Sequence, residues 1–182
     1  AGLRSLGPVW SRHNAFGHGA PMTLQTDLDP GKGLSPKGFE LIHACDNLGI
    51  MIDLSHLTEA GFWDVAKTTT RPLIATHSNA HAISPNARNL TNRQLAAVAE
   101  SKGVVGLNFH VQFLRADCKM DKSTPITEMI RHLDHLLGFL GEDGVAIGSD
   151  FDGCVLPAEI GDVTGLQKLI TAMKHAQYGD RL

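Results

Sequence analysis

Two histidines that each end an apolar run carry the clearest chemical signal in this sequence. His56 follows the run GIMIDLS at 49–55, and His77 follows PLIAT at 72–76. Because the carboxyl ends of parallel strands meet at one edge of a sheet, we expect the two imidazoles to lie close together. A single strand-end histidine more often bonds a backbone carbonyl. Two at equivalent positions favour a shared metal ion.

An acid and an arginine add to this candidate site. Asp150 ends an apolar run within GSDFDG at 148–153, where small neighbours allow a close backbone approach, so we assign it to chemistry. We assign Asp152 to an Asp-Gly turn. Arg88 lies on the loop that follows His77. The sequence leaves it open as a solvated surface residue or as a fork for a carboxylate or phosphate.

Other polar residues carry weaker signals. Asp53 lies three residues before His56, so we expect it to face the opposite side of the strand as a structural partner. His110 ends another predicted strand and is a weak candidate. The run HLDH at 132–135 resembles a metal motif, but residues two apart on a helix point to different sides, which predicts a polar helix face. All six glutamates fall on or beside predicted helices, so none supplies the carboxylate that bridges a two-metal site.

Strands and helices alternate along the chain. Strands are predicted at 6–10, 50–56, 73–77, 103–110 and 144–148, and helices at 36–48, 58–67, 91–102, 126–140 and from about 162, with a long loop at 11–32. This alternation of strands and helices predicts an α/β fold with a parallel sheet and right-handed crossovers. A complete eight-unit barrel needs roughly 250 residues. We therefore expect residues 1–182 to form one incomplete TIM-barrel domain of about five βα units, or a smaller open sheet.

Composition excludes several classes of partner. The net charge of −3 shows no excess of basic residues of the kind that binds nucleic acid or an anionic membrane. We find no apolar run near 18 residues and no signal-peptide pattern. The three cysteines are widely spaced and form no CxxC motif. This usage fits a reducing compartment, so we expect a cytoplasmic protein.

Four ordered motifs resemble one known family. IDLSH at 52–56, THSN at 76–79, RN at 88–89 and GSDFDG at 148–153 are similar in order and spacing to the membrane (renal) dipeptidase family. The opening GLRSL at 2–6 is similar to its bacterial members, and the resemblance spans essentially the whole chain. It implies a zinc-dependent, amidohydrolase-type TIM barrel that cleaves dipeptides.

The resemblance also implies roles for single residues. His56 and His77 would be ligands of one of two zinc ions, and Arg88 would hold the free carboxylate of a dipeptide substrate. Asp150 would be catalytic, managing protons for the bridging water and the leaving amine. Many family members have a substrate-contacting histidine where this chain has Ser11. His13 would take over that substrate-binding role.

The family pattern further implies that the chain is a fragment. The H-x-D pair and the bridging glutamate of the family would precede Ala1, and a final strand would follow Leu182. A complete site would hold two zinc ions, for which this chain supplies the ligands of one. We therefore expect weak zinc binding and poor catalysis from the chain alone.

Two further functions stay open at this point. The chain could be a non-catalytic barrel fragment or subunit that needs a partner chain, because the open edges of a parallel sheet favour pairing. A homodimer is one form of such pairing. The other alternative is a different metal hydrolase on the same scaffold, acting in deamination or lactone cleavage, since a fold does not fix a function.

Overall fold

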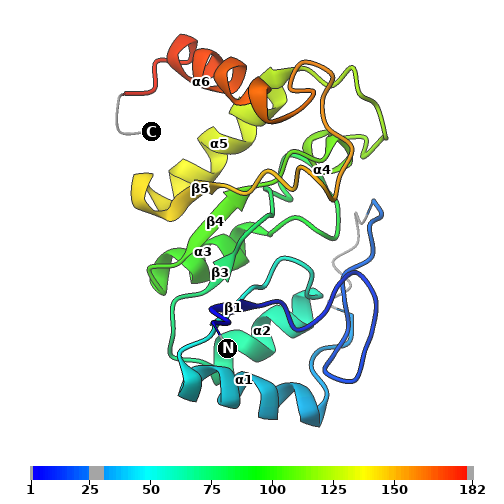
Figure 1. The fold of residues 1–182 in the computed structure, drawn as a ribbon, viewed down its shortest axis with the longest axis vertical. Coiled ribbons are helices and arrows are strands. Elements are labelled where there is room, and N and C mark those ends of the chain that lie inside the picture. The colour runs from blue at the N-terminus through cyan, green and yellow to red at the C-terminus, as the bar shows by residue number, and fades with distance from the viewer. Residues whose placement is uncertain (1, 25–30, 180–182) are drawn as a thin grey trace.

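The computed structural model describes residues 2–24 and 31–179 of the 182-residue chain. Short strands alternate with helices along it (Figure 1). The strands are β1 (Ser5–Leu6), β2 (Met51–Ile52), β3 (Ile74–Ala75), β4 (Val104–Leu107) and β5 (Val145–Ile147).

All pairings between these strands are parallel. β1 pairs with β2, and β3, β4 and β5 form a sheet in that order. A parallel bridge between Asp53 and Ile74 joins the two groups. The backbone N–H of Leu54 also donates to the carbonyl of Ile74 at 2.9 Å. The strands therefore lie in chain order, which confirms the predicted α/β class, and the described strands form no closed barrel.

Helices connect the strands and pack against them. They are α1 (Pro36–Leu48), α2 (Glu59–Thr68), α3 (Asn92–Glu100), α4 (Val111–Leu114), α5 (Ile126–Leu140) and α6 (Leu166–His175), with 3-10 turns η1 (Glu142–Gly144) and η2 (Val163–Gly165). α1 packs on α2 and β2, whereas α3 and α5 pack on each other and on β4. α6 packs on α5 at the far end of the molecule (Figure 1).

Local signals explain where several helices begin and end. The hydroxyl of Ser35 accepts a hydrogen bond from the N–H of Gly38 at the start of α1, and Gly49 ends that helix at a φ of 67°. Thr91 and Gln94 form a reciprocal capping box at the start of α3, as the sequence predicts. These caps fix the helices that flank β2 and β3, and with them the two histidine-bearing strand ends.

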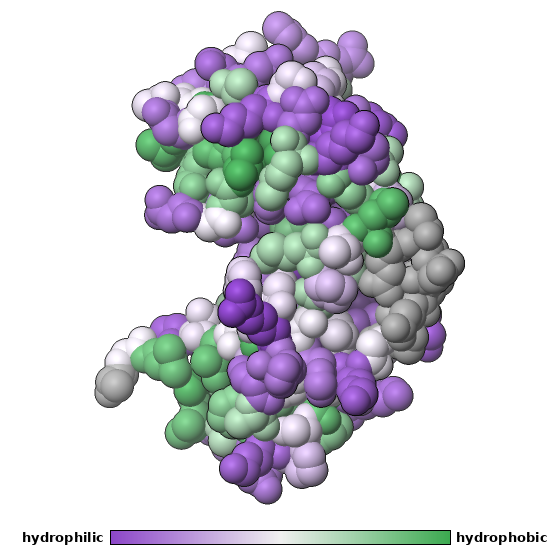
Figure 2. All heavy atoms as spheres, turned by 90° about the vertical axis from the view of Figure 1, so that its right-hand side faces the viewer, coloured by the Kyte–Doolittle hydropathy of each residue, from purple (hydrophilic) through white to green (hydrophobic). Residues whose placement is uncertain are grey.

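One buried hydrophobic cluster runs from Val9 to Leu169 and includes the junction where β4 meets α3 and α5. Val105 and Leu107 of β4 are fully buried, together with Met129 and Leu136 of α5. β5 packs on one side only and leaves Ile147 47% exposed. Figure 2 shows the resulting outline, a crescent that is hollowed on one side.

The predicted strands at 50–56, 73–77 and 144–148 contain the shorter β2, β3 and β5, and the two other predicted strands differ more from the structure. The strand expected at 6–10 is wrong, because β1 ends at Leu6 and Pro8 has no N–H to donate to a ladder. The strand expected at 103–110 ends at Leu107 and is followed by α4, which we did not predict. The described parts of the loop at 11–32 contain isolated bridges and no helix, and residues 25–30 lie outside the described part of the chain. In the segments that the structure describes, no helix has the length and apolar character needed to span a membrane.

Candidate functional site

The two predicted metal ligands point at each other. Nε2 of His56 lies 3.0 Å from Nε2 of His77, and the ring centroids are 5.0 Å apart. Two nitrogens that each lie about 2.0–2.1 Å from a tetrahedral zinc ion are about 3.3 Å apart. The pair therefore fits two positions around a single metal ion with little movement.

Each ring is oriented through its other nitrogen. The hydroxyl of Ser11 lies 3.0 Å from Nδ1 of His56, and the hydroxyl of Thr76 lies 2.7 Å from Nδ1 of His77. Oδ2 of Asp53 lies 3.7 Å from the same Nδ1 and accepts a hydrogen bond from Thr76 at 2.7 Å. Partners of this kind fix the ring orientation of metal-binding histidines.

The expectation that Asp53 faces away from the histidines is wrong. β2 ends at Ile52, so residues 53–56 do not keep the alternation of a strand. Oδ1 of Asp53 accepts hydrogen bonds from both the N–H and the hydroxyl of Ser55, at 3.1 and 2.6 Å, and from the N–H of Thr76 at 2.9 Å. Asp53 thus ties the ends of β2 and β3 together directly beside His77.

Both rings are neutral near pH 7. Burial, the Arg88 cation and His77 lower the pKa of His56 to about 3. Burial and Arg88 also lower the pKa of His77, although Asp53 and Asp150 oppose that change. Burial raises the pKa of Asp53, but the hydrogen bonds from Ser55 and Thr76 outweigh it, so the pKa falls below its usual value. Neutral imidazole with an available lone pair is the form that binds a metal.

Arg88 is not a solvated surface residue. It is only 2% exposed, and its Nη2 donates to the carbonyl of His77 at 3.3 Å. Its Nε and Nη1 have no hydrogen-bond partner among the described residues. Burial lowers the pKa of Arg88 to about 10, opposed by Asp53 and Asp150, so the guanidinium stays charged at pH 7. Buried, uncommitted N–H groups of this kind fit a planar anion such as a carboxylate.

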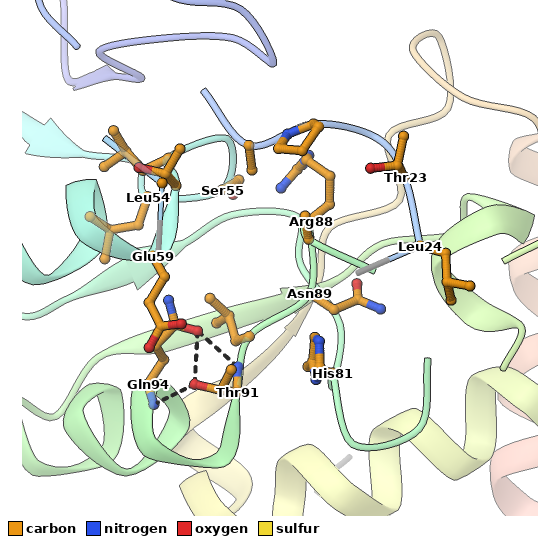
Figure 3. A pocket seen from close by; sticks show the side chains of 17 residues that line it. Thr23, Leu24, Leu54, Ser55, Glu59, His81, Arg88, Asn89, Thr91 and Gln94 are labelled. Atoms are coloured by element: carbon orange, nitrogen blue, oxygen red, sulfur yellow. Dashed lines mark hydrogen bonds between the residues drawn. The ribbon is translucent and has the colours of Figure 1, made fainter. Parts of the chain in front are cut away.

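A pocket of about 330 Å³ adjoins Arg88. Figure 3 shows Ser55 and Arg88 on its wall, with Glu59 and the capping box of Thr91 and Gln94 on the side of α2 and α3. The wall also includes Asn89, whose Oδ1 is buried without a partner in the described chain. Polar groups with free hydrogen-bonding capacity in a concave site are typical of ligand binding.

Asp150 lies near the same group of residues. Its backbone has a φ of 61°, a left-handed conformation in which Asp and Asn are enriched among residues with a side chain. Nδ2 of Asn108 donates to its Oδ2 at 3.1 Å, and the same Nδ2 lies 3.4 Å from the carbonyl oxygen of His77. The structure therefore brings together His56, His77, Arg88 and Asp150.

His13 lies outside this group. Its side chain is exposed and stacks on His18 with ring centroids 5.8 Å apart. Within the described ranges, no hydrogen bond, ion pair or ring contact joins it to the four residues above. The weak candidate His110 is buried, and its Nδ1 has no partner among the described residues.

Residues 132–135 were predicted to form a polar helix face, and this prediction is wrong for the first of them, His132. His132 is completely buried, because it lies on the same face of α5 as Met129, Leu133 and Leu136. Its Nδ1 accepts a hydrogen bond from the N–H of Ala80 at 3.1 Å, so Nε2 carries the proton and donates to the carbonyl of Leu114 at 3.1 Å. Both nitrogens are satisfied, and His132 is a structural residue.

The described chain supplies only part of a metal site. Across residues 2–24 and 31–179, no group of three or more His, Cys, Asp or Glu side chains converges to hold a metal ion. Structural and catalytic zinc sites use at least three protein ligands. The histidine pair therefore fits a metal as two of its ligands, with further ligands required from elsewhere.

The hydrogen-bonding partners of the predicted residues were not among our predictions. Ser11 and Thr76 lie beside the histidine rings, and Asn79 and Asn108 lie behind them at the ends of β3 and β4. Thr76 and Asn108 lie in the last three residues of the predicted strands at 73–77 and 103–110, and Ser11 and Asn79 lie within two residues after a predicted strand. This closeness to a strand end was the available signal. We looked for histidines and carboxylates, the usual metal ligands, and therefore did not single out side chains with hydroxyl or amide groups.

Comparison with known proteins gives a family for this chain. The family model described as membrane dipeptidase, peptidase family M19, matches residues 1–182. A Klebsiella pneumoniae protein from the 5′ region of pqqA is 50% identical over 178 residues, which are 98% of this chain and 66% of that protein. A Schizosaccharomyces pombe protein described as an uncharacterized dipeptidase is 36% identical over 124 residues, 68% of this chain and 29% of that protein.

Solved structures agree in fold. A metallopeptidase from Rhodobacter sphaeroides, crystallised with a phosphinate mimic of the dipeptide L-Ala-D-Ala, is 54% identical with a TM-score of 0.96 over 98% of this chain and 51% of its own. The probable dipeptidase PvdM from Pseudomonas aeruginosa shares the fold, with a TM-score of 0.82 at 20% identity, over 98% of this chain and 58% of its own.

The chain spans from about half to about two thirds of the length of the relatives that match nearly all of it. The match to the family model nevertheless covers every residue. The four motifs and the converging histidines lie within the matched range. This chain belongs to the membrane dipeptidase family, peptidase family M19.

Proposed function

We propose that the whole protein containing this chain is a zinc dipeptidase. The observation that carries the proposal is the convergence of Nε2 of His56 and Nε2 of His77 at 3.0 Å, with each Nδ1 engaged by a hydroxyl. Membership of family M19 and the dipeptide mimic bound to the Rhodobacter sphaeroides relative support it.

We also propose the architecture in which this site is completed. The parallel strands in chain order and the hollowed crescent support residues 1–182 as one incomplete TIM-barrel domain of about five βα units. The complete site would hold two zinc ions, with His56 and His77 as ligands of one. Because the described residues offer no third ligand, this chain alone would bind zinc weakly and catalyse poorly.

Arg88 would bind the free carboxylate of the dipeptide. Nη2 donates to the carbonyl of His77, while Nε and Nη1 keep N–H donors that no described residue accepts and that can serve the carboxylate. This carbonyl belongs to His77, a candidate metal ligand. The hydrogen bond from Arg88 therefore fixes the distance between the site for the substrate carboxylate and the metal site. Such a fixed distance suits a substrate with a single peptide bond before its carboxylate.

Asp150 would hold and transfer protons. A zinc ion held by His56 and His77 would supply Lewis-acid activation of water and of the scissile carbonyl. In the proposed reaction, the carboxylate of Asp150 accepts a proton from the attacking water and delivers it to the leaving amine. The hydrogen bond from Asn108 to Oδ2 leaves Oδ1 for this exchange.

Hydrolysis of L-Ala-D-Ala by the full-length, zinc-loaded protein tests the proposal. We expect release of free alanine, and little hydrolysis of the same dipeptide with its carboxylate converted to an amide. Arg88→Gln should raise KM for the dipeptide by about 10-fold or more, because a charge-assisted hydrogen bond of about 1.5–3 kcal/mol is lost. The variant should no longer distinguish the acid from the amide.

Arg93→Gln is the matched control for this experiment. Arg93 is an exposed arginine that stacks on Trp63 at 4.4 Å, and it belongs to α3 rather than to the site. It should leave KM and the preference for the free acid unchanged. A full-length protein that is loaded with zinc and does not cleave dipeptides would refute the proposed function.

A further inference from the structure

The side chain of Asn108 connects three strand ends at the candidate site. Its Nδ2 donates to Oδ2 of Asp150 at 3.1 Å, after β5, and approaches the carbonyl of His77 at 3.4 Å, after β3. Its Oδ1 accepts from the backbone N–H of His110 at 2.7 Å. Two acceptors face the amide nitrogen and one donor faces the oxygen, so the orientation of the amide is determined.

Asn108 is itself held in place. The side-chain oxygen of Asn79 accepts from the N–H of Asn108, and the side-chain nitrogen of Asn79 donates to the carbonyl of Asn108, each at 2.9 Å. Asn79 thereby continues the hydrogen-bond ladder beyond Leu107, where β4 ends. Both asparagines are fully buried, so neither exchanges these partners with solvent.

Asp150 needs such support. Its left-handed backbone, at a φ of 61°, sets the direction of the side chain but is costly for a residue with a Cβ. Within residues 2–24 and 31–179, the carboxylate of Asp150 receives one side-chain hydrogen bond, and its donor is Asn108. The direction of the carboxylate therefore depends on a single donor.

We infer that Asn108 is a positioning residue that aims the carboxylate of Asp150 at the candidate site. This inference rests on the proposed function, in which Asp150 transfers protons. Because the same amide nitrogen also approaches the carbonyl of His77, Asn108 fixes the acid relative to the histidine pair and to the anchor of Arg88. Residues that orient a catalytic group in this way typically contribute about 10–100-fold to activity.

A double-mutant cycle in the full-length, zinc-loaded protein tests this role. Asn108→Ala should lower kcat for L-Ala-D-Ala about 10–100-fold with little change in KM, because Asp150 acts on protons rather than on binding. Asn108→Asp keeps the shape and the acceptor for His110 but turns an oxygen toward Asp150. It should therefore be at least as harmful as Asn108→Ala.

The decisive comparison repeats the substitution in an Asp150→Asn background, where asparagine also tolerates the left-handed backbone. There, Asn108→Ala should change kcat by less than about twofold, since the group that it positions is gone. An equal loss in both backgrounds would overturn the inference. His132→Gln changes a buried side chain whose hydrogen bonds go to Ala80 and Leu114 and not to Asp150, so its effect should be the same in both backgrounds.

Crystal structures of the wild type and of Asn108→Ala give a readout that does not depend on activity. In Asn108→Ala, we expect the carboxylate of Asp150 to be rotated away from its wild-type position, while His56 and His77 stay in place. An unmoved carboxylate would contradict the positioning role. If the wild type cleaves no dipeptide, the proposed function fails, and these structures still decide whether Asn108 holds Asp150.

Discussion

Single histidines in this chain differ in chemistry because of their hydrogen-bond partners. His56 and His77 each have one nitrogen engaged by a hydroxyl and direct the other into the site. His132 has both nitrogens engaged by backbone groups, the N–H of Ala80 and the carbonyl of Leu114. The first arrangement leaves a lone pair for a ligand. The second uses the whole ring to hold α5 against the segment after β3 and against the last residue of α4.

The buried state of His132 predicts a specific dependence of stability on pH. Burial lowers its pKa from 6.5 to about 4 in the folded protein, whereas the unfolded chain keeps the ordinary value. Between these values the unfolded state binds more protons, so the free energy of unfolding falls as the pH falls from 6.5 to 4. The full loss from this one residue is about 3 kcal/mol.

Thermal unfolding of the wild type and of His132→Gln between pH 7.5 and pH 4 measures this contribution. The variant should have a lower Tm at pH 7.5, because buried hydrogen bonds are disturbed, and a smaller decrease of Tm toward pH 4. His56, His77 and His110 also have lowered pKa values, so both proteins should retain some slope. Parallel curves for the two proteins would contradict a neutral, buried His132.

Close packing of β3, β4 and β5 depends on two glycines. A Cβ at Gly106 of β4, or at Gly148 just after β5, would overlap the carbonyl oxygen of Thr76, the residue before His77. The spacing between the strand ends, and with it the position of His77, therefore requires residues without a side chain here.

Gly106→Ala should destabilise the protein by about 2 kcal/mol or more, because the overlapping group is backbone and cannot rotate away. Gly138→Ala is the control, since a Cβ at this position in α5 meets nothing within 4 Å. It should stabilise the helix by about 0.5–1 kcal/mol. Chemical denaturation of the two variants measures both values, and equal stability of Gly106→Ala and the wild type would contradict the packing argument.

Much of the element order could be predicted, because its signals are local. Caps at Ser35 and Thr91 and the apolar period of α5 mark helices wherever they occur. α4 has only four residues, too few for a period to be detected. The strand expected at 6–10 failed because apolar residues around Pro8 resemble a strand although the proline cannot complete a ladder.

The candidate site was predictable only in part. His56 and His77 end predicted strands and Asp150 follows one, so their positions could be inferred, whereas the sequence left Arg88 open. The structure brings all four together. The contacts of Asp53 and Asn108 were not predictable. They depend on where a strand stops and on which neighbour lies opposite, and a single sequence does not contain that information.

At the scale of the whole molecule, the crescent has an open edge at β5. β5 pairs with β4 on one side, and Ile147 on it is 47% exposed. An exposed apolar edge strand favours pairing with another chain. The alternative of a subunit that needs a partner, or a homodimer, is therefore testable at this strand.

We expect the purified 182-residue chain to self-associate through β5. Ile147→Lys should shift the sedimentation profile toward the monomer, because a charge on the edge opposes strand pairing. Leu48→Lys is the control, since Leu48 is 73% exposed at the end of α1, away from the sheet edge, and should leave the profile unchanged. A wild-type chain that is monomeric at all concentrations would exclude association through this edge.

His56 and His77 together are proposed to bind a zinc ion, and this binding is the first property to test. Native mass spectrometry of the 182-residue chain with added zinc measures it most directly, with the His56→Ala, His77→Ala double variant and with His132→Gln as a histidine control. If the pair binds zinc, we expect about one weakly held zinc ion per chain in the wild type and in His132→Gln, and none in the double variant. Equal zinc content in the wild type and the double variant would contradict it.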